Sequence, residues 1–354
     1  MSKARGLADL GNVYDDGALS NRNLIINGAM QVAQRGTSFT GLTNGYTLDR
    51  WASYQTVDFL NQQQDTDAPE GFTKSLKTTV DTASALSADD LSRVAYNVEA
   101  QDVARLGYGT ADAQTTTLSF WVKSTVTGDY TIFMYVGDPN RSIVKGYSIN
   151  TANTWEYKTI VIAGDTAGSG INNDNGNGIT FEWNLLAGST WNTAGAQDTW
   201  VTGAGIRASG QTANCGASGA TWQITGVQLE VGDTATPFEH RSYGQELALC
   251  QRYCEVLTAS AYGAYANGWF EGTSTFKAFY TYKVVKRAVP TLSSSGSFSA
   301  DGAASNPTLS SLTGGAQLNG AVLEWSCSGA TSGQGGNLIN NNDAAATITL
   351  DAEL

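Results

Sequence analysis

Short apolar runs separated by clusters of turn-forming residues dominate the sequence from residue 23 to residue 240. In 118–123 and 179–185, apolar residues alternate with mostly polar ones, which is the period of a strand with one buried face. The run 130–136 is apolar on both faces, which predicts a central strand between two layers. These patterns predict a mostly β fold, with about eight to ten strands packed as two sheets in a jelly-roll-like β-sandwich over residues 23–240.

The strand expected over 222–231 changes its phase at Gly226. Apolar residues occupy even positions before this glycine and odd positions after it. Because a regular strand keeps alternate side chains on one face, the change predicts a bulge or a sharp bend at this point.

Composition limits the functions that are open to such a fold. The chain has 354 residues, a formal charge of −12, and only 15% charged residues. An acidic chain without a long basic run lacks the charge that nucleic-acid binding requires, so we expect no nucleic acid as a partner. Its only histidine, His240, removes His-based zinc sites and makes any Ser-His-Asp catalysis depend on that residue. No signal peptide is recognisable and no apolar run approaches the ~20 residues of a membrane span, so no membrane insertion is expected.

Metal and disulfide chemistry also find little support in the sequence. The four cysteines, Cys215, Cys250, Cys254 and Cys327, form no CxxC pair, which favours reduced thiols in a protein assembled in a cytoplasm. The Gly- and Asn-rich loop at 164–178 is a candidate for calcium, but the spacing of its Asp and Asn residues does not match a calcium loop. We therefore expect no metal and no cofactor.

Residues 1–22 contain too few apolar side chains to build a core and are expected to form an N-terminal arm. The candidate anchoring residues in this arm are Leu7, Leu10, Val13 and Tyr14. They could form one helical face that docks on a larger body, or they could belong to a frayed tail.

A single helix is predicted, over 242–257 within a connecting segment 241–258. Ser242 and Gln245 have the spacing of a capping box at its start. Steps of four and three residues then give the a/d seam of a coiled coil. The seam residues are Tyr243, Leu247, Cys250, Cys254 and Leu257. Such a helix could pack on its own chain or against symmetry mates.

Residues 259–354 are expected to form a second, smaller β domain. Exposed aromatic rings in it could stack on sugar rings, framed by hydrogen-bonding side chains. The candidate glycan-binding residues are Tyr262, Tyr265, Trp269, Phe270 and Trp325. Each of these rings could instead belong to the core.

Three parts of the sequence together resemble the tail-fibre and related virion-fibre proteins of phages, many of them marine and cyanobacterial. The first part joins 21–36 (NRNLIINGAMQVAQRG) and 46–51 (YTLDRW). The second joins 222–232 (WQITGVQLEVG) and 236–253 (TPFEHR, then YGQELALCQRY after Ser242). The third is 283–291 (KVVKRAVPT), a form of an R-x-x-P-T element.

Most conspicuous residues within these parts are expected to be architectural. Asn27 and Asp49 fit a tight turn and the edge of a core better than a ligand contact. Glu230, Glu239 and Arg241 are expected to fix how the sandwich leads into the helix.

The resemblance implies a homotrimeric virion fibre, assembled in the host cytoplasm, with a jelly roll similar to carbohydrate-binding modules. Residues 1–22 would attach it to other tail or capsid proteins. Its distal surface would bind host surface polysaccharide without catalysis. The same modules could also serve a capsid-mounted fibre, a decoration protein or a tail adaptor. A polysaccharide-degrading tailspike is a weaker alternative, because the sequence contains no parallel β-helix repeat.

Overall fold

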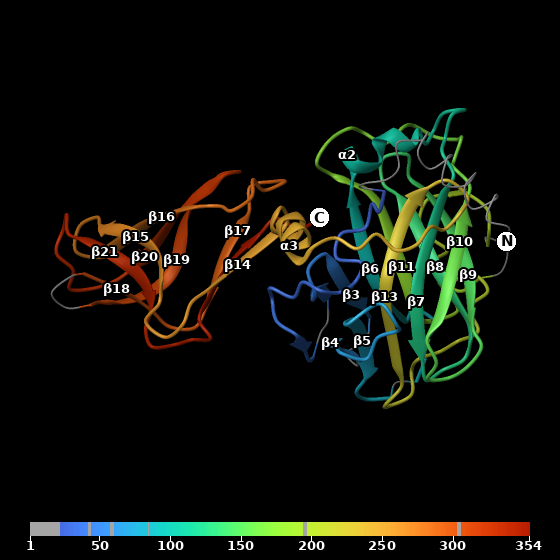
Figure 1. The fold of residues 1–354 in the computed structure, drawn as a ribbon, viewed down its shortest axis with the longest axis horizontal. Helices are drawn as coiled ribbons and strands as arrows, with labels where there is room; N and C mark the ends of the chain where they lie inside the picture. The colour runs from blue at the N-terminus through green and yellow to red at the C-terminus, as the bar shows by residue number, and fades with distance from the viewer. Residues whose placement is uncertain (1–21, 42–43, 57–59, 84, 194–196, 303–305) are drawn as a thin grey trace. The chain divides into compact units, whose positions relative to one another are not determined.

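The computed structural model of the chain is drawn in Figure 1. It describes residues 22–41, 44–56, 60–83, 85–193, 197–302 and 306–354. The chain forms two compact units, of which the first ends at Glu246 and the second runs from Leu247 to Leu354. No helix within these described ranges is long and apolar enough to cross a membrane.

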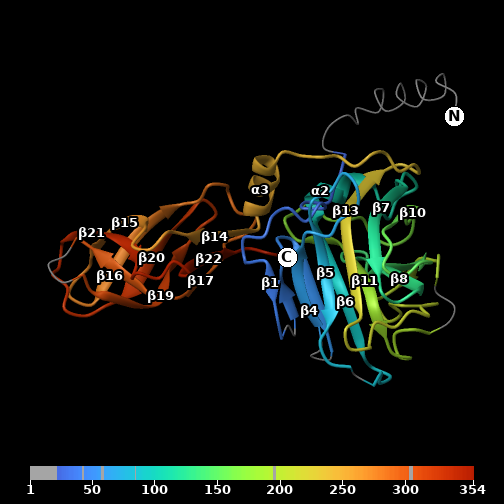
Figure 2. The same ribbon diagram turned by 60° about the horizontal axis from the view of Figure 1, so that its bottom comes forward.

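The first unit is a sandwich of two antiparallel sheets, seen from two sides in Figures 1 and 2. Among the described residues, one sheet has six strands in the order β1 (Ser38–Phe39), β4 (Leu60–Asp65), β5 (Ser75–Val80), β13 (Thr221–Val231), β7 (Thr116–Ser124) and β10 (Glu156–Ile162). The other has seven in the order β12 (Val201–Thr202), β9 (Arg141–Ile149), β8 (Gly128–Val136), β11 (Asn177–Ala187), β6 (Leu91–Glu99), β3 (Trp51–Gln55) and β2 (Asn44–Tyr46). A short helix, α2 (Ala100–Val103), and a 3-10 turn at Ala104–Leu106 follow β6.

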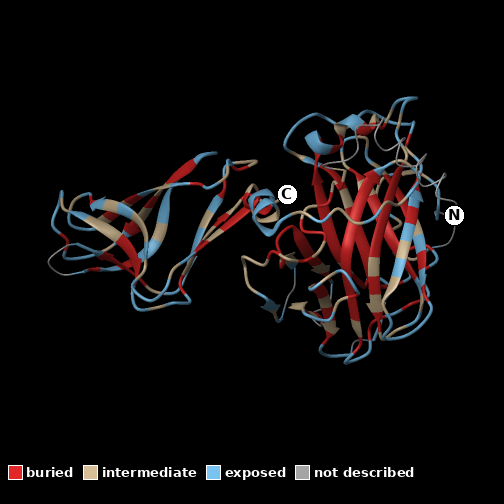
Figure 3. Cartoon of the chain, in the orientation of Figure 1, coloured by how far each residue is buried: buried red, intermediate tan, exposed pale blue. Residues whose placement is uncertain are grey.

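This architecture confirms the predicted jelly-roll-like sandwich. Strand β8, the all-apolar run, lies inside its sheet and is buried over most of its length. Phe120 of the six-stranded sheet packs edge-on against Trp183 of the other, with ring centroids 6.0 Å apart. Figure 3 shows the buried residues concentrated on the strands of both sheets. The strands number more than expected because β1, β2 and β12 have only two or three residues, too few to show a period.

The predicted irregularity at Gly226 is confirmed. Strand β13 changes register against β7 between Thr225 and Gln228. Gly226 lies inside this bulge with φ at +63°, a left-handed conformation that glycine adopts without strain. A Cβ atom on Gly226 would lie 2.6 Å from Cζ of Phe72, so the bulge also makes room for that ring.

The second unit contains the expected smaller β domain. Six strands close into a barrel in the order β15 (Ala264–Phe270), β16 (Thr275–Thr281), β20 (Gly320–Ser326), β19 (Thr308–Ala316), β18 (Phe298–Asp301) and β21 (Gly335–Asn340). A three-stranded sheet has the order β14 (Cys254–Thr258), β22 (Thr347–Asp351) and β17 (Thr291–Ser295).

The predicted helix begins where expected but ends early. Helix α3 spans Tyr243–Gln251, and the Ser242 hydroxyl accepts a hydrogen bond from the Gln245 backbone N–H at 3.4 Å, as a capping box requires. Cys254 and Leu257 lie instead in β14, where all five residues pair with β22. The continuous helical seam over Tyr243, Leu247, Cys250, Cys254 and Leu257 is therefore wrong. Strand pairing, together with burial of Cys254 and Leu257, outweighs the helical spacing of the apolar residues.

Two further expectations from the sequence concern the cysteines and the N-terminal arm. None of the four cysteines, all of which lie in the described ranges, forms a disulfide, and three of them are buried. Residues 1–21 lie outside the described residues, so the anchoring role expected for Leu7, Leu10, Val13 and Tyr14 stays a prediction.

Candidate functional site

Two of the five aromatic candidates belong to the core of the barrel. Phe270 is 1% exposed and Trp325 is 2% exposed. The Trp325 ring lies 4.7 Å from that of Phe298, and the Phe270 ring lies 5.0 Å from that of Phe276, centroid to centroid. The prediction that these two rings bind glycans is wrong, because both project from their strands into the barrel.

Tyr265 is also a structural residue. It is half-buried, its ring packs 5.6 Å from that of Phe298, and its hydroxyl donates a hydrogen bond of 2.7 Å to the carbonyl of Ala346. Burial raises the pKa of the Tyr265 hydroxyl above its usual value. Tyr262 is exposed just before β15, but none of the ring contacts found among the described residues involves it.

Trp269 is the aromatic candidate that is both exposed and placed beside polar groups that could bind a ligand. It is 43% exposed on β15, directly opposite Lys277 of β16. Lys277 in turn stands opposite Glu324 of β20. Two residues further along β16, Phe279 is 57% exposed opposite Val322. Because alternate strand residues share a face, these five side chains share one outer face of the barrel, which we call the barrel platform.

The charges of the barrel platform are paired with one another. The Lys277 ammonium contacts the carboxylate of Glu271 and lies 3.4 Å from that of Glu324. The hydrogen bond that the Lys277 ammonium donates to Glu271, together with the attraction of both carboxylates, raises the pKa of Lys277. The two exposed rings are thus flanked by hydrogen-bonding groups.

Phe279 was missed by the sequence analysis, although a signal for it existed. In the sequence, Phe276, Ala278, Tyr280 and Tyr282 occupy alternate positions, which is the period of a strand with one buried face. This phase places Phe279 on the opposite, outer face, in agreement with the burial of Phe276 and Ala278.

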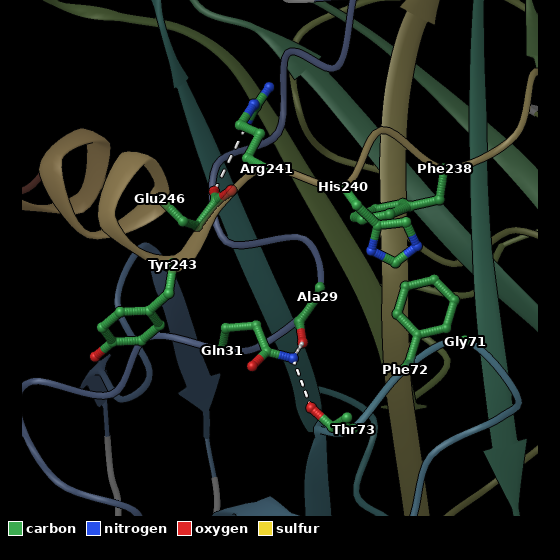
Figure 4. A pocket seen from close by; sticks show the side chains of 10 residues that line it. All are labelled: Ala29, Gln31, Gly71, Phe72, Thr73, Phe238, His240, Arg241, Tyr243 and Glu246. Atoms are coloured by element: carbon green, nitrogen blue, oxygen red, sulfur yellow. Dashed lines mark hydrogen bonds and ion pairs between the residues drawn. The ribbon is translucent and has the colours of Figure 1, made fainter.

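The first unit contains a pocket of about 220 Å³, shown in Figure 4. It is lined by Ala29, Gln31, Gly71, Phe72, Thr73, Phe238, His240, Arg241, Tyr243 and Glu246. These residues come from the turn after Asn27, the segment between β4 and β5, and the segment that joins β13 to α3.

Three rings form one wall of this pocket. The ring centroids of Phe72 and Phe238 are 5.1 Å apart, those of Phe72 and His240 are 5.4 Å apart, and those of Phe238 and His240 are 4.9 Å apart. The position of Phe72 depends on the bulge at Gly226, since a side chain there would collide with it. On the floor, the Gln31 amide donates a hydrogen bond of 3.0 Å to the Thr73 hydroxyl.

The segment after β13 is held by charged groups, as predicted for Glu230, Glu239 and Arg241. Glu230 accepts hydrogen bonds from the backbone N–H and the hydroxyl of Thr236, at 2.9 and 2.6 Å. Glu239 accepts one of 2.8 Å from the backbone N–H of Asn23. The Arg241 guanidinium donates to the carbonyl of Asn23 and lies 3.5 Å from the Glu239 carboxylate. These contacts fix the course of the chain from the sandwich toward α3.

The turn residues within the resembling parts are structural as well. Asn27 is buried with φ at +59°, and its side chain bonds the backbone of Val32 and Asp49 at 2.9 Å. Asp49 is likewise buried, and its carboxylate accepts a hydrogen bond of 2.7 Å from the backbone N–H of Gln34.

The single histidine and the loop 164–178 are the places where the sequence allows catalysis or a metal ion. His240 packs on two phenylalanine rings, and its imidazole makes no hydrogen bond to any residue in the described ranges. In the loop 164–178, Asp165 pairs with the Arg141 guanidinium at 2.6 Å. Over the part of the chain that the structure covers, no group of three or more His, Cys, Asp and Glu residues is placed to hold a metal ion.

No protein-family model and no curated protein matches the chain. Among solved structures, a family 61 carbohydrate-binding module in complex with β-1,4-galactotriose aligns with 60% of this chain and 100% of its own, at 9% identity and a TM-score of 0.31. The xylan-binding domain of a Paenibacillus barcinonensis protein aligns with 56% and 94%, at 10% identity and a TM-score of 0.27.

A third such structure is a family 11 carbohydrate-binding module from Clostridium thermocellum in complex with a mixed-linked tetrasaccharide. It aligns with 58% of this chain and 99% of its own, at 13% identity and a TM-score of 0.27. None of these comparisons links the chain to phage fibres.

Proposed function

We propose that this protein is a non-catalytic glycan-binding protein and that it serves as a virion fibre of a phage. The observation that carries the glycan-binding part is the barrel platform, where Trp269 of β15 and Phe279 of β16 expose their rings on the same outer face. Large exposed aromatic side chains grouped on one face mark a binding surface rather than a core.

The chemistry of the barrel platform suits a carbohydrate. Sugar rings carry apolar C–H faces that pack on aromatic rings, and their hydroxyl groups need nearby donors and acceptors. Lys277 and Glu324 supply such groups beside the two rings. An exposed strand face can bind along an extended polysaccharide, because it encloses neither end of the polysaccharide.

The fibre part of the proposal is supported by the sequence resemblance. It extends from residue 21 to residue 291 in the order found in virion-fibre proteins. A fibre that attaches a particle to a cell needs many weak contacts, so no single deep site is required. A surface polysaccharide of the host is the partner that this combination favours.

Binding of the purified protein to immobilised bacterial surface polysaccharides tests the glycan-binding part. We predict that Trp269→Ala and Phe279→Ala each weaken binding about three- to tenfold, since an aromatic contact contributes roughly 0.5–1.5 kcal/mol beyond its buried area. Both side chains are exposed, so the thermal unfolding temperature should change little.

The matched control is Tyr157→Ala, which removes an exposed ring from β10 of the first unit. It should leave binding unchanged. If the Trp269→Ala/Phe279→Ala double variant bound as tightly as the natural protein, the barrel platform would not be the glycan site.

A further inference from the structure

The lining of the pocket in Figure 4 includes polar groups that make no hydrogen bonds within the described part of the protein. In the figure, the Gln31 amide lies between the Tyr243 ring on one side and the Phe72 and His240 rings on the other. Tyr243 is 58% exposed, and its hydroxyl makes no hydrogen bond to any residue in the described ranges. The same holds for the imidazole nitrogens of His240, within the same described ranges. Rings and polar groups that face a cavity in this way are available to a ligand.

The size of the pocket limits what it can hold. Its volume of about 220 Å³ lies below the ~300–1,000 Å³ of pockets for drug-sized ligands. A single six-membered ring with its substituents fits such a space, whereas an extended chain does not.

The charges around the pocket favour an uncharged ligand. Arg241 and Glu246 are the two ionised side chains in its lining, and their charged groups lie 3.5 Å apart. The Arg241 guanidinium also donates to the carbonyl of Ile25 at 3.1 Å. Since the two opposite charges offset one another, neither a carboxylate nor an ammonium group on the ligand would gain a net attraction.

We infer that this pocket binds one neutral sugar ring, as the terminal or branching residue of a glycan. The ring's apolar faces pack against the aromatic side chains of the lining, Tyr243, Phe72 and His240. Its hydroxyl groups reach the Gln31 carbonyl oxygen, the Thr73 hydroxyl and the Glu246 carboxylate. This inference adds a second site, in the first unit, to the glycan binding proposed for the barrel platform, and it rests on that proposed function only for the class of ligand.

The single histidine gives this inference a direct readout. In the full-length protein labelled with ¹³C-histidine, His240 produces the only imidazole signal. We expect this signal to shift in a saturable way when methyl glycosides of glucose, galactose, mannose or N-acetylglucosamine are titrated in. Tyr243→Ala should weaken the titrated affinity about three- to tenfold, because it removes one of the stacking rings.

Trp269→Ala is the control, since it removes a ring of the barrel platform and should leave the titration of His240 unchanged. If none of the four methyl glycosides moved the His240 signal, or if Tyr243→Ala left the affinity unaltered, the inference would be overturned. Polysaccharide binding by the Tyr243→Ala variant then separates the two sites. If only the Trp269→Ala and Phe279→Ala variants lose polysaccharide binding, the proposed function stands without the pocket. If only the Tyr243→Ala variant loses it, the pocket alone binds the glycan.

Discussion

At the scale of single residues, the second unit contains a fully buried ion pair. The ammonium of Lys286 lies 2.8 Å from the carboxylate of Glu255, and neither side chain is exposed. Lys286 also donates to the carbonyl of Gln251 at 2.5 Å, and Tyr280 donates to Glu255 at 2.7 Å. Burial lowers the pKa of Lys286, while the contact with Glu255 acts in the opposite direction. Such a pair is stable only while both partners are present.

We predict that Lys286→Ala lowers the free energy of unfolding of the second unit by ~3–5 kcal/mol, since it leaves a carboxylate buried without its counter-charge. Urea unfolding followed by circular dichroism measures the effect. Lys283→Ala is the matched control, because Lys283 is 62% exposed at 3.8 Å from the same carboxylate and should contribute less than ~1 kcal/mol. Equal losses in the two variants would contradict this account.

The aromatic residues show how far a sequence can identify a site of this kind. The aromatic-rich segment after the helix was recognised, and Trp269 lies on its exposed face. Phe270, one residue later, points into the barrel, and Trp325 does so from another strand. Composition cannot separate such neighbours, because exposure depends on the phase of the strand and on which strands pair with it. The pocket at His240 could not be predicted from the sequence for a related reason, because its walls come from segments that are far apart in the sequence.

At the scale of elements, local sequence patterns predict the structure correctly where the chemistry of the backbone determines it. The phase change at Gly226 produced a bulge, and the capping box at Ser242 began a helix. The end of α3 could not be predicted from local sequence patterns. The segment Cys254–Thr258 has helical spacing of its apolar residues, but the strand Thr347–Asp351, about ninety residues away, pairs with it instead.

We predict that Gly226→Ala destabilises the first unit by ~1–3 kcal/mol and displaces Phe72. Two effects combine, a left-handed backbone that alanine rarely adopts and a Cβ atom 2.6 Å from the Phe72 ring. Gly219→Ala isolates the first effect, since its φ is +79° with nothing within 4 Å of the added atom. Thermal unfolding should show the larger loss for Gly226→Ala, and the His240 signal should shift in that variant only. Equal behaviour of the two variants would remove the steric role of the bulge.

At the scale of the whole molecule, the surface is poor in charge. Only 15% of residues are charged, so uncharged polar groups must cover much of the exterior. Ion pairs at a surface are weakened by salt, whereas ring stacking and neutral hydrogen bonds are far less sensitive to it. The glycan-binding surface proposed for this protein would therefore keep most of its affinity when the salt concentration changes.

The proposed fibre also has to be multivalent. The helical seam that suggested a place for three-fold contact is absent, so the homotrimer implied by the resemblance is tested on the full chain. We predict a light-scattering mass of three times the 37.2 kDa of one chain. Retention on a polysaccharide surface should then exceed the affinity for a short soluble oligosaccharide by roughly 10²–10⁴, because the second and third contacts form within one assembly. A mass of one chain, with equal affinities for surface and oligosaccharide, would contradict the fibre proposal while leaving the barrel platform intact.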